Sequence, residues 1–394
     1  DVYQVISEQS NFEMRVEDVS HLNGITRDNA IHQLTNDVVT QEFDLANDSL
    51  LRVLLIKIAE LESLVVINLH HIVADGWSMC ILIGEINHIY KHLTQGVDDE
   101  LAPLEVQYAD YSHWQNQWMA GKVRDDELKF WKKQLNNVPA LHSLPLDYPR
   151  PAELGVKGER KVATISSELL TRIKAVCAEQ ECTLFMFLQT AFALLLSRCS
   201  NEDEVVMGTP VAGRNDTALE PLIGFFVNSL VLRTEFDQNE TFTQLLTRNK
   251  GDILSAFENQ HVPFELIVEE INAPRSLSHH PVFQVLFSLQ NTEKQLLEID
   301  NVVWNPYNLE NGNIKFDLEL TATEKSGQIE LIWCYNLDLF KEGTILHLVE
   351  SYMALLNSIL DNLDTSVLSL KLIEYEQEVE STEHSISKQI ETEW

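Results

Sequence analysis

Two adjacent histidines are the residues of this sequence best suited to proton chemistry. His70 and His71 close the apolar run INLHH, and Asp75 and Gly76 follow four and five residues after the second histidine. An imidazole can take up or release a proton near neutral pH, and a neighbouring carboxylate can hold it in place. If both histidines end a strand, their side chains point to opposite faces, so one is expected to face the interior and the other a cleft.

The loop IVADG is expected to bring Asp75 back beside the end of that strand. There its carboxylate can accept hydrogen bonds from backbone amides or pair with a cation, which would fix the surroundings of the histidine. Gly76 is expected to keep the backbone open where a side chain would collide with a substrate or strain the chain.

Other chemistries fit the same residue types less well. A metal site built from His70, His71 and Asp75 is disfavoured, because neighbouring side chains of a strand diverge. A Ser-His-Asp hydrolase needs a nucleophile elbow such as GxSxG, which the sequence lacks, and Ser78 is a poor substitute. Two hydrogen-bonded core histidines beside an ordinary Asp-Gly turn would need no chemistry at all, and the motif alone does not decide against them.

The elements expected around the motif place it between a strand and a helix. Two apolar runs separated by a charged turn, SLLRVLLIKIAELESLVVINLHH, predict a hairpin that ends at the histidines. After ADG, apolar residues recur at helical spacing and predict a helix. These residues are Met79, Ile83, Ile86, Tyr90 and Leu93.

Strand and helix patterns alternate along the whole chain, which predicts an α/β protein. A length of 394 residues, 44% of them hydrophobic, favours two lobes. A proline-rich, aperiodic stretch near Pro151 is expected to separate an N-terminal lobe, residues 1–150, from a C-terminal lobe, residues 151–372. From Ile373 the sequence is acidic and poor in core residues, so residues 373–394 are expected to form an acidic linker tail.

The composition excludes several classes of partner. A net charge of −33 repels phosphate backbones and anionic lipid, so neither nucleic acid nor membrane is an expected partner. The apolar stretch from Leu184 to Cys199 is too short to span a bilayer and is expected to be a buried helix. The chain opens DVYQVISEQS without a signal peptide, so a cytoplasmic location is expected.

The cysteines are five in number and scattered, without a CxxC pair. They are Cys80, Cys177, Cys182, Cys199 and Cys334. A disulfide framework or a zinc cage needs closer, paired spacing, so free or buried thiols in a reducing compartment are expected, and no metal.

The motif HHIVADG matches the HHxxxDG signature of the chloramphenicol-acetyltransferase-like acyltransferases. Its continuation WSM resembles that of the condensation domains of non-ribosomal peptide synthetases. Further stretches resemble that family in order and spacing: YADYSHWQ at 108–115, GTPVAGRN at 208–215, IGFFVNSLVLR at 223–233, NQHVPFE at 259–265, RSLSHHPVFQVLFSLQN from Arg275, and KFDLEL from Lys315. The resemblance covers nearly the whole chain. It implies two chloramphenicol-acetyltransferase-like lobes, each a mainly β sheet flanked by helices, in a V-shaped pseudo-dimer with a tunnel between them.

The resemblance also has a gap. The family normally opens with a helix carrying SxAQxRLW and a strand carrying RHExLRTxF, and neither occurs here, so the chain resembles a condensation domain that lacks its N-terminal segment. In the family, the arginine of RHExLRTxF pairs with the motif aspartate. Asp75 would therefore need another cation, and whether Arg52 or a different residue provides it stays open at this point.

The resemblance narrows the activity. Heterocyclising relatives carry an aspartate in place of His70, and epimerising relatives carry a tryptophan two residues later than Trp77. Peptide-bond formation fits best: transfer of an acyl or peptidyl group from a donor carrier-protein thioester to the amine of an acceptor aminoacyl carrier protein. An O-acyltransferase of the same superfamily and a catalytically impaired module that docks carrier proteins stay open as alternatives.

The resemblance also assigns roles. His71 is the expected catalytic residue, while His70, Asp75 and Gly76 support it. The residues expected to border the substrate tunnel are Trp77, Ser78, Gly224, Asn228 and Ser229. Strand alternation places Asn228 on the same side as Phe226 and Leu230, so Asn228 is expected to point inward. Arg214 and Arg275 could meet a pantetheine phosphate or a carrier helix, although surface arginines usually do neither.

The expected partners follow from the same resemblance. They are donor and acceptor peptidyl carrier domains and, through the C-terminal linker, an adjacent adenylation domain. No intrinsic cofactor is expected, because 4′-phosphopantetheine is carried by the carrier domains.

Overall fold

The computed structural model describes residues 3–6, 12–96, 101–290, 298–299, 302–305, 307 and 312–373. The chain divides into two compact units. The first unit consists of Asp1–Asp126, Val211–Asn228 and Glu293–Glu310, and the second of Glu127–Pro210, Ser229–Thr292 and Asn311–Trp394. The chain first passes from the first unit into the second after Asp126. The sequence predicts this boundary near Pro151. Of the predicted acidic tail, residues 374–394 lie outside the described residues.

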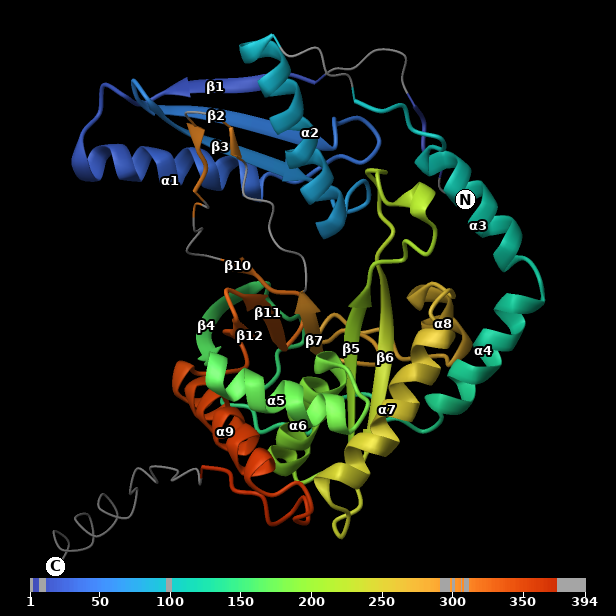
Figure 1. The fold of residues 1–394 in the computed structure, drawn as a ribbon. Coiled ribbons are helices and arrows are strands. Elements are labelled where there is room, and N and C mark those ends of the chain that lie inside the picture. Colours follow the sequence, from blue (N-terminus) through green and yellow to red (C-terminus); the bar gives the residue numbers. More distant parts are fainter. Residues whose placement is uncertain are drawn as a thin grey trace, which may run out of the picture. The chain divides into compact units, whose positions relative to one another are not determined.

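The first unit contains a three-stranded sheet in the order β1-β2-β3 (Figure 1). Its strands are β1 (Met14–Asp18), β2 (Leu51–Ala59) and β3 (Glu62–Leu69), with β1 parallel to β2 and β2 antiparallel to β3. The hairpin predicted before the histidines is confirmed, with Leu51 opposite Leu69. Helix α1 (Gly24–Thr40) covers one face of the sheet and completes a small core of Val19, Ile31, Val38, Leu54, Ile56 and Val66.

Two further helices complete the first unit. The helix predicted after ADG is confirmed as α2 (Gly76–Gln95), which begins at the N-cap Asp75 and ends at Gly96 in the left-handed conformation, with φ 66°. Helix α3 (Tyr108–Met119) begins with a capping box between Gln107 and Asp110. Helix α4 (Lys122–Gln134) then carries the chain into the second unit. A short 3-10 helix (Thr217–Leu219) and the strand pair β8 (Glu298–Ile299) and β9 (Val302–Val303) also belong to the first unit.

The second unit is built on a seven-stranded mixed sheet in the order β10-β4-β12-β11-β7-β5-β6. The strands are β4 (Lys157–Ile165), β5 (Glu204–Val211), β6 (Asn228–Glu235), β7 (Val285–Gln290), β10 (Gly312–Asn313), β11 (Leu318–Lys325) and β12 (Gln328–Asn336). The helices are α5 (Ser167–Glu179), α6 (Leu184–Ser200), α7 (Phe242–Glu258), α8 (Phe264–Glu270) and α9 (Glu342–Asp361). The predicted α/β class is therefore confirmed, with helices flanking a sheet in each unit (Figure 1).

The core of the second unit forms around α6. The sequence predicts a buried helix from Leu184 to Cys199, and the structure confirms it, since every residue from Met186 to Ser197 is buried. The ring of Phe192 packs edge-on against Trp333 and Tyr352, at centroid distances of 5.5 and 6.1 Å. This aromatic contact joins α6 to β12 and α9.

Helix α9 is long and apolar enough, by length and composition alone, to cross a membrane. Helices α5 and α6 pass the same test as a pair, although they meet at a bend of 105°. However, the apolar side of α9, including Ile345, Tyr352 and Leu356, is buried within the second unit. This burial is the pattern of a core helix.

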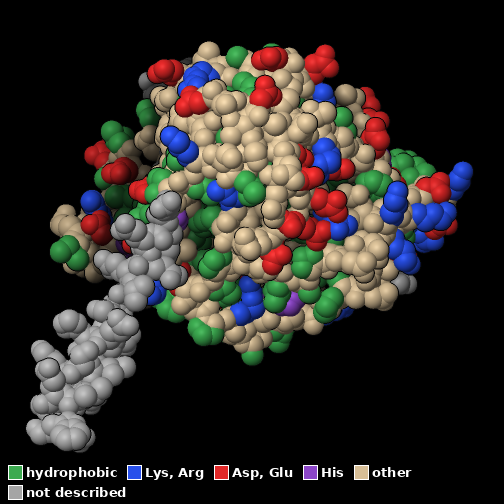
Figure 2. Space-filling view, turned by 90° about the horizontal axis from the view of Figure 1, so that it is seen from below, with side chains coloured by type: hydrophobic (Ala, Val, Ile, Leu, Met, Phe, Trp, Pro, Cys, Tyr) green, Lys and Arg blue, Asp and Glu red, His purple; other side chains and the backbone are tan. Residues whose placement is uncertain are grey.

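On the face shown in Figure 2, acidic side chains are scattered with Lys and Arg side chains among them.

Gly208 on β5 leaves no room for a side chain. A Cβ atom there would lie 2.1 Å from Cε2 of the buried Phe283 ring. We expect Gly208→Ala to lower the free energy of unfolding by about 1–3 kcal/mol, because overfilling a packed core forces its neighbours to move. Gly251 in α7 is the matched control, since a Cβ there meets nothing within 4 Å, and Gly251→Ala should stabilise the helix by up to about 1 kcal/mol. Urea titration measures both changes; equal loss in the two variants would contradict this prediction.

Candidate active site

His70 lies immediately after β3 and is built into the turn that follows. Its backbone N–H donates to the carbonyl of Leu50 (3.0 Å), and its Nδ1 accepts from the N–H of Ile72 (3.1 Å). Its half-buried ring meets the ring of Phe43 edge-on, with a centroid distance of 5.7 Å. Through these contacts, His70 holds the turn in place.

His71 is exposed, in contrast to the half-buried His70. Its ring stands edge-on to the ring of Phe225, with centroids 5.1 Å apart and an interplanar angle of 83°. The prediction that the two histidines end a strand is wrong, because β3 ends at Leu69 and His71 belongs to the turn. The turn, rather than strand alternation, therefore separates their environments.

Asp75 is 5% exposed and is the centre of a hydrogen-bond network. Its Oδ1 accepts from the backbone N–H of Ser78 (2.8 Å) and from Ser78 Oγ (2.7 Å), which caps α2. Its Oδ2 accepts from the N–H of Phe226 (3.1 Å). Burial alone would raise the pKa of Asp75, but the hydrogen bonds from Ser78 and Phe226 and the charge of Arg214 outweigh it and lower this pKa.

Arg214 is the cation that pairs with Asp75. Its Nη2 lies 3.3 Å from Asp75 Oδ1, and the two side chains are 1% and 4% exposed. The same guanidinium donates to the carbonyls of Leu219 (2.5 Å) and Leu222 (2.8 Å) and stands 4.1 Å over the Phe226 ring. Arg214 therefore folds the segment 214–226 around the carboxylate of Asp75. The sequence left open a contact of Arg214 with a pantetheine phosphate or a carrier helix, and a side chain that is 1% exposed does not fit such a contact.

Arg52 is not the partner of Asp75. Its guanidinium donates to the carbonyls of Gln41 (2.7 Å) and Glu42 (2.8 Å) and pairs with Asp48 (2.8 Å). The question that the sequence left open is thus answered in favour of Arg214. Arg275, the other arginine considered, is 81% exposed at its side chain and lies 3.8 Å from Glu269.

Two residues expected to border a substrate passage are packed inside the first unit. Ser78 is 0% exposed, and its Oγ lies 2.8 Å from the carbonyl of Gly224 and accepts from Arg214 Nη2 (2.9 Å). Gly224 is buried, and a Cβ there would lie 2.3 Å from the Tyr108 ring. The prediction that Ser78 and Gly224 line a tunnel is wrong, because both are part of the Asp75 network.

The other predicted residues lie nearer the surface. Trp77 is 41% exposed, and its Nε1 donates to the carbonyl of Glu220 (3.1 Å). Gly76 is the exposed first residue of α2, and a Cβ there would meet no protein atom within 4 Å, so packing does not require a glycine. Asn228 and Ser229 are half-buried at the start of β6. Since β6 begins at Asn228, strand alternation does not extend back to Phe226, and the argument that turned Asn228 inward loses its basis.

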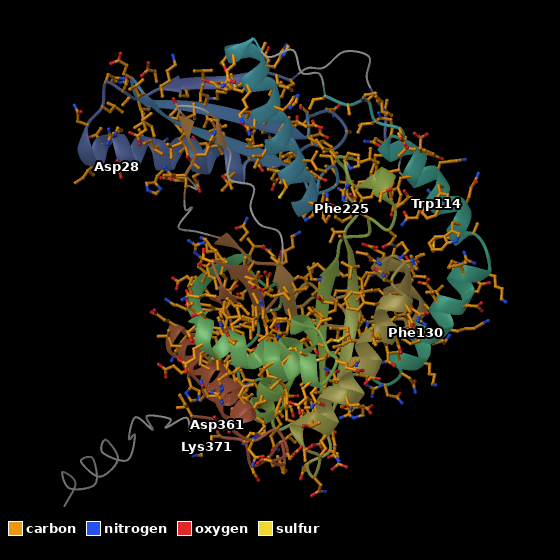
Figure 3. The ribbon with its side chains drawn as sticks, viewed as in Figure 1. Asp28, Trp114, Phe130, Phe225, Asp361 and Lys371 are labelled. Atoms are coloured by element: carbon orange, nitrogen blue, oxygen red, sulfur yellow. The ribbon has the colours of Figure 1, made fainter. Side chains whose placement is uncertain are left out.

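Tyr108 and Tyr111 of α3 are site residues that sequence reasoning missed. The hydroxyl of Tyr108 donates to the carbonyl of Phe225 (2.9 Å), and both tyrosine rings pack against Phe226 at centroid distances of 5.1 and 4.7 Å. Burial raises the pKa of Tyr108, and the charge of Asp75 adds to this. Tyr108 thus holds the backbone of Phe225, whose ring contacts His71. Figure 3 labels Phe225 in the first unit. The stretch YADYSHWQ carried the signal, but only as a family motif.

A second buried charge cluster lies in the second unit. Asp317, of the stretch KFDLEL, is 1% exposed and pairs with Arg150 and with His142 Nε2 (2.8 Å). Burial alone would raise the pKa of Asp317, but the hydrogen bonds and charges of His142 and Arg150 lower it. The cluster ties the segment before β4 to the start of β11.

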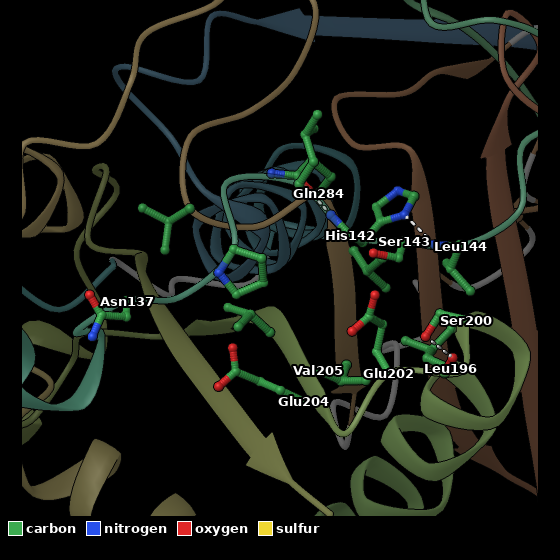
Figure 4. A pocket seen from close by; sticks show the side chains of 15 residues that line it. Asn137, His142, Ser143, Leu144, Leu196, Ser200, Glu202, Glu204, Val205 and Gln284 are labelled. Carbon is green, nitrogen blue, oxygen red and sulfur yellow. Dashed lines mark hydrogen bonds between the residues drawn. The ribbon is translucent and has the colours of Figure 1, made fainter.

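A cavity of about 240 Å³ lies beside this cluster, in the second unit (Figure 4). Its polar lining includes Asn137, Ser143, Glu202 and Glu204 and none of the predicted site residues. Glu204 is already paired with Arg233. Within the described ranges, no group of three or more His, Cys, Asp or Glu side chains is arranged to hold a metal ion.

Removing either charge of the Asp75–Arg214 pair should destabilise the first unit. We expect Asp75→Ala and Arg214→Ala each to lower the free energy of unfolding by about 3–5 kcal/mol, because each leaves a buried charge unpaired. The double variant should lose clearly less than the sum of the two, and denaturant titration of the four proteins measures this coupling. Arg52→Ala is the control and should add to Asp75→Ala without coupling. Additivity of the first pair would refute the interaction.

The same carboxylate should make stability depend on pH. Because the folded chain lowers the pKa of Asp75 below its usual 3.8, its contribution is complete above that value and is lost as the pH falls through the lowered pKa. We therefore expect Asp75→Asn to lower the melting temperature at pH 7 and to flatten its fall between about pH 5 and about pH 2. A variant whose melting temperature falls as steeply as the parent's would contradict this assignment.

The comparisons with known proteins agree with this architecture. A family model described as "Condensation domain" matches residues 1–380. One polypeptide of the linear gramicidin synthase of Brevibacillus parabrevis is 36% identical over 372 residues, which are 94% of this chain and 5% of that protein. Gramicidin S synthase 2 of Aneurinibacillus migulanus is 34% identical over 354 residues, 89% of this chain and 8% of that protein. The chain thus spans less than a tenth of the length of either relative.

Solved structures share the fold. The X-domain in its complex with OxyB from teicoplanin biosynthesis gives a TM-score of 0.84 at 24% identity, covering 95% of this chain and 82% of that chain. The four-domain non-ribosomal peptide synthetase AB3403, bound to AMP and glycine, gives 0.79 at 23% identity, covering 92% of this chain and 28% of that chain. With the family match over residues 1–380, these findings show that the chain belongs to the condensation domain family.

Proposed function

We propose that the chain forms peptide bonds in non-ribosomal peptide synthesis. It would transfer an acyl or peptidyl group from the thioester of a donor carrier protein to the amine of an acceptor aminoacyl carrier protein. The observation that carries this proposal is the exposed imidazole of His71, which lies at the start of the turn that leads to the buried Asp75. Membership of the condensation domain family supports it.

The reaction depends more on the alignment of the amine with the thioester than on a strong base. A thioester carbon is already electrophilic, and an α-amine with a pKa of about 8 is partly neutral at pH 7. The amine nitrogen attacks the carbonyl carbon, and the tetrahedral intermediate then expels the carrier thiol. His71 orients the amine, takes up its proton as the C–N bond forms, and returns it to the departing sulfur. Phe225 limits the orientations that the His71 ring can adopt.

His70 and Asp75 are positioning residues in this proposal. The contacts of His70 with Ile72 and Phe43 hold the turn, and the contacts of Asp75 with Ser78 and Phe226 hold the loop that follows. Neither needs to touch substrate. Gly76, Trp77, Asn228 and Ser229 lie near enough to the surface to meet a bound substrate arm, whereas Ser78 and Gly224 do not.

The partners follow from the same activity. The curated relatives are synthetases many times longer than this chain, which supports neighbouring carrier domains and an adenylation domain. The 4′-phosphopantetheine arms belong to the carrier domains and enter as part of the substrates.

His71→Ala should separate chemistry from folding. We expect it to lower the rate of dipeptidyl-carrier formation by about tenfold to a hundredfold, the usual scale for losing a proton-handling group. Because the side chain is exposed, the melting temperature should stay within about 2 °C of the parent's. His21→Ala, at another exposed histidine of the first unit, is the control and should leave the rate unchanged.

The assay uses loaded donor and acceptor carrier proteins and follows the product by mass spectrometry. Undiminished condensation by a folded His71→Ala chain would remove His71 from catalysis. Including carriers with alcohol acceptors tests the O-acyltransferase alternative, which predicts ester rather than amide products. No product from the parent with either acceptor would favour the docking module.

A further inference from the structure

The turn between α5 and α6 brings two cysteines together. Helix α5 ends with a Schellman motif: the N–H of Cys182 donates to the carbonyl of Cys177 (2.9 Å), and the N–H of Glu181 donates to the carbonyl of Ala178 (3.4 Å). Glu181 takes the left-handed conformation, with φ 49°, that this motif requires. In a Schellman motif the side chains at the positions of Cys177 and Cys182 commonly contact each other. Here both positions carry a thiol.

The two thiols are neighbours across the Schellman motif and differ in exposure. Each influences the pKa of the other, and Cys177 Sγ lies 3.8 Å from the carbonyl of Thr183. Cys177 is 7% exposed, whereas Cys182 is half-buried. A small reagent from solvent would therefore reach Cys182 before Cys177.

The surroundings favour a thiolate at Cys182. The hydrogen bond from Cys177 and the charge of Lys250 in α7 lower the pKa of Cys182, against the effect of burial. The same hydrogen bond and burial raise the pKa of Cys177. Burial raises the pKa of Cys199 to about 11 and also raises that of Cys334. A thiolate is the nucleophilic form of cysteine, so Cys182 combines reactivity with access.

We propose that Cys177 and Cys182 are a redox modification site, at which a hydroperoxide converts the two thiols into a reversible disulfide. The Cys182 thiolate attacks one oxygen of hydrogen peroxide and becomes a sulfenic acid, and the other oxygen leaves as water after taking up a proton. The Cys177 thiol then displaces water from the sulfenic acid and forms the S–S bond. Two thiols and one peroxide thus give one disulfide and two waters. The bond would lock the turn that leads into α6, the core helix of the second unit.

This inference does not depend on the proposed condensation activity. The sequence alone did not indicate this cysteine pair, because it contains no CxxC motif. Cys177 and Cys182 are five residues apart, and the motif that ends α5 brings them together.

The test treats the 394-residue chain with a small excess of hydrogen peroxide and measures its intact mass without reductant. We expect a loss of about 2 Da, the mass of two hydrogen atoms, and a fall from five free thiols to three. Dithiothreitol should restore all five. Glu179 and Glu181 lie between the two cysteines, so cleavage after glutamate should release two peptides that stay linked until reduced.

Three variants identify the roles. Cys177→Ser should stop the bridge and leave a Cys182 sulfenic acid that dimedone captures, while Cys182→Ser should stop both reactions. Cys80→Ser, at the exposed cysteine of the first unit, should form the bridge as the parent does. Oxygen addition at Cys182 of the parent without bridging would overturn the proposal, as would oxidation that begins at Cys80 and leaves the Cys177–Cys182 pair reduced.

Discussion

The buried ion pair of Asp75 and Arg214 is the constraint on which the candidate site depends. Removing two charges from water costs several kcal/mol for each ion, so such a pair persists only where further hydrogen bonds satisfy both groups. Here Asp75 also accepts from Ser78 and Phe226, and Arg214 also donates to two carbonyls and stacks on Phe226. One carboxylate thereby caps α2 and holds a segment that lies 139 residues away in sequence.

The position of His71 follows from that pair through a short series of contacts. Asp75 fixes the N–H of Phe226, Tyr108 fixes the neighbouring carbonyl of Phe225, and the Phe225 ring meets the ring of His71. The hydrogen bond of Asp75 to Phe226 is buried, whereas that of Tyr108 to Phe225 lies at the surface of the first unit. An exposed imidazole without such contacts would sample several rotamers, so this arrangement would supply the preorganisation that the proposed reaction requires.

The sequence predicted the elements around the site better than the site itself. Apolar periodicity correctly placed the β2–β3 hairpin and α2, and the ordered motifs correctly indicated the family. The rule that successive side chains of a strand point to opposite faces does not apply beyond the ends of the strand. It therefore gave wrong expectations at His70, which follows β3, and at Phe226, which precedes β6. The burial of Ser78 could not be predicted from the sequence either. A serine three residues after an aspartate is equally compatible with a helix cap and with a surface turn. The partner of Asp75 had no local signal, since the pairing with Arg214 is set by the tertiary fold.

The same limit applies to the cation that the family resemblance predicts beside Asp75. The resemblance pairs the motif aspartate with the arginine of RHExLRTxF, and among the described residues Arg214 is the cation that pairs with Asp75. What the fold requires is a buried cation at Asp75, because an unpaired carboxylate there would be costly, whereas the strand that supplies the cation is not fixed by that requirement. A motif read from sequence therefore identifies the group that needs a partner, and only the packed structure identifies which residue meets the need. His71 differs, since its ring is exposed and the role proposed for it is in the reaction rather than in stability.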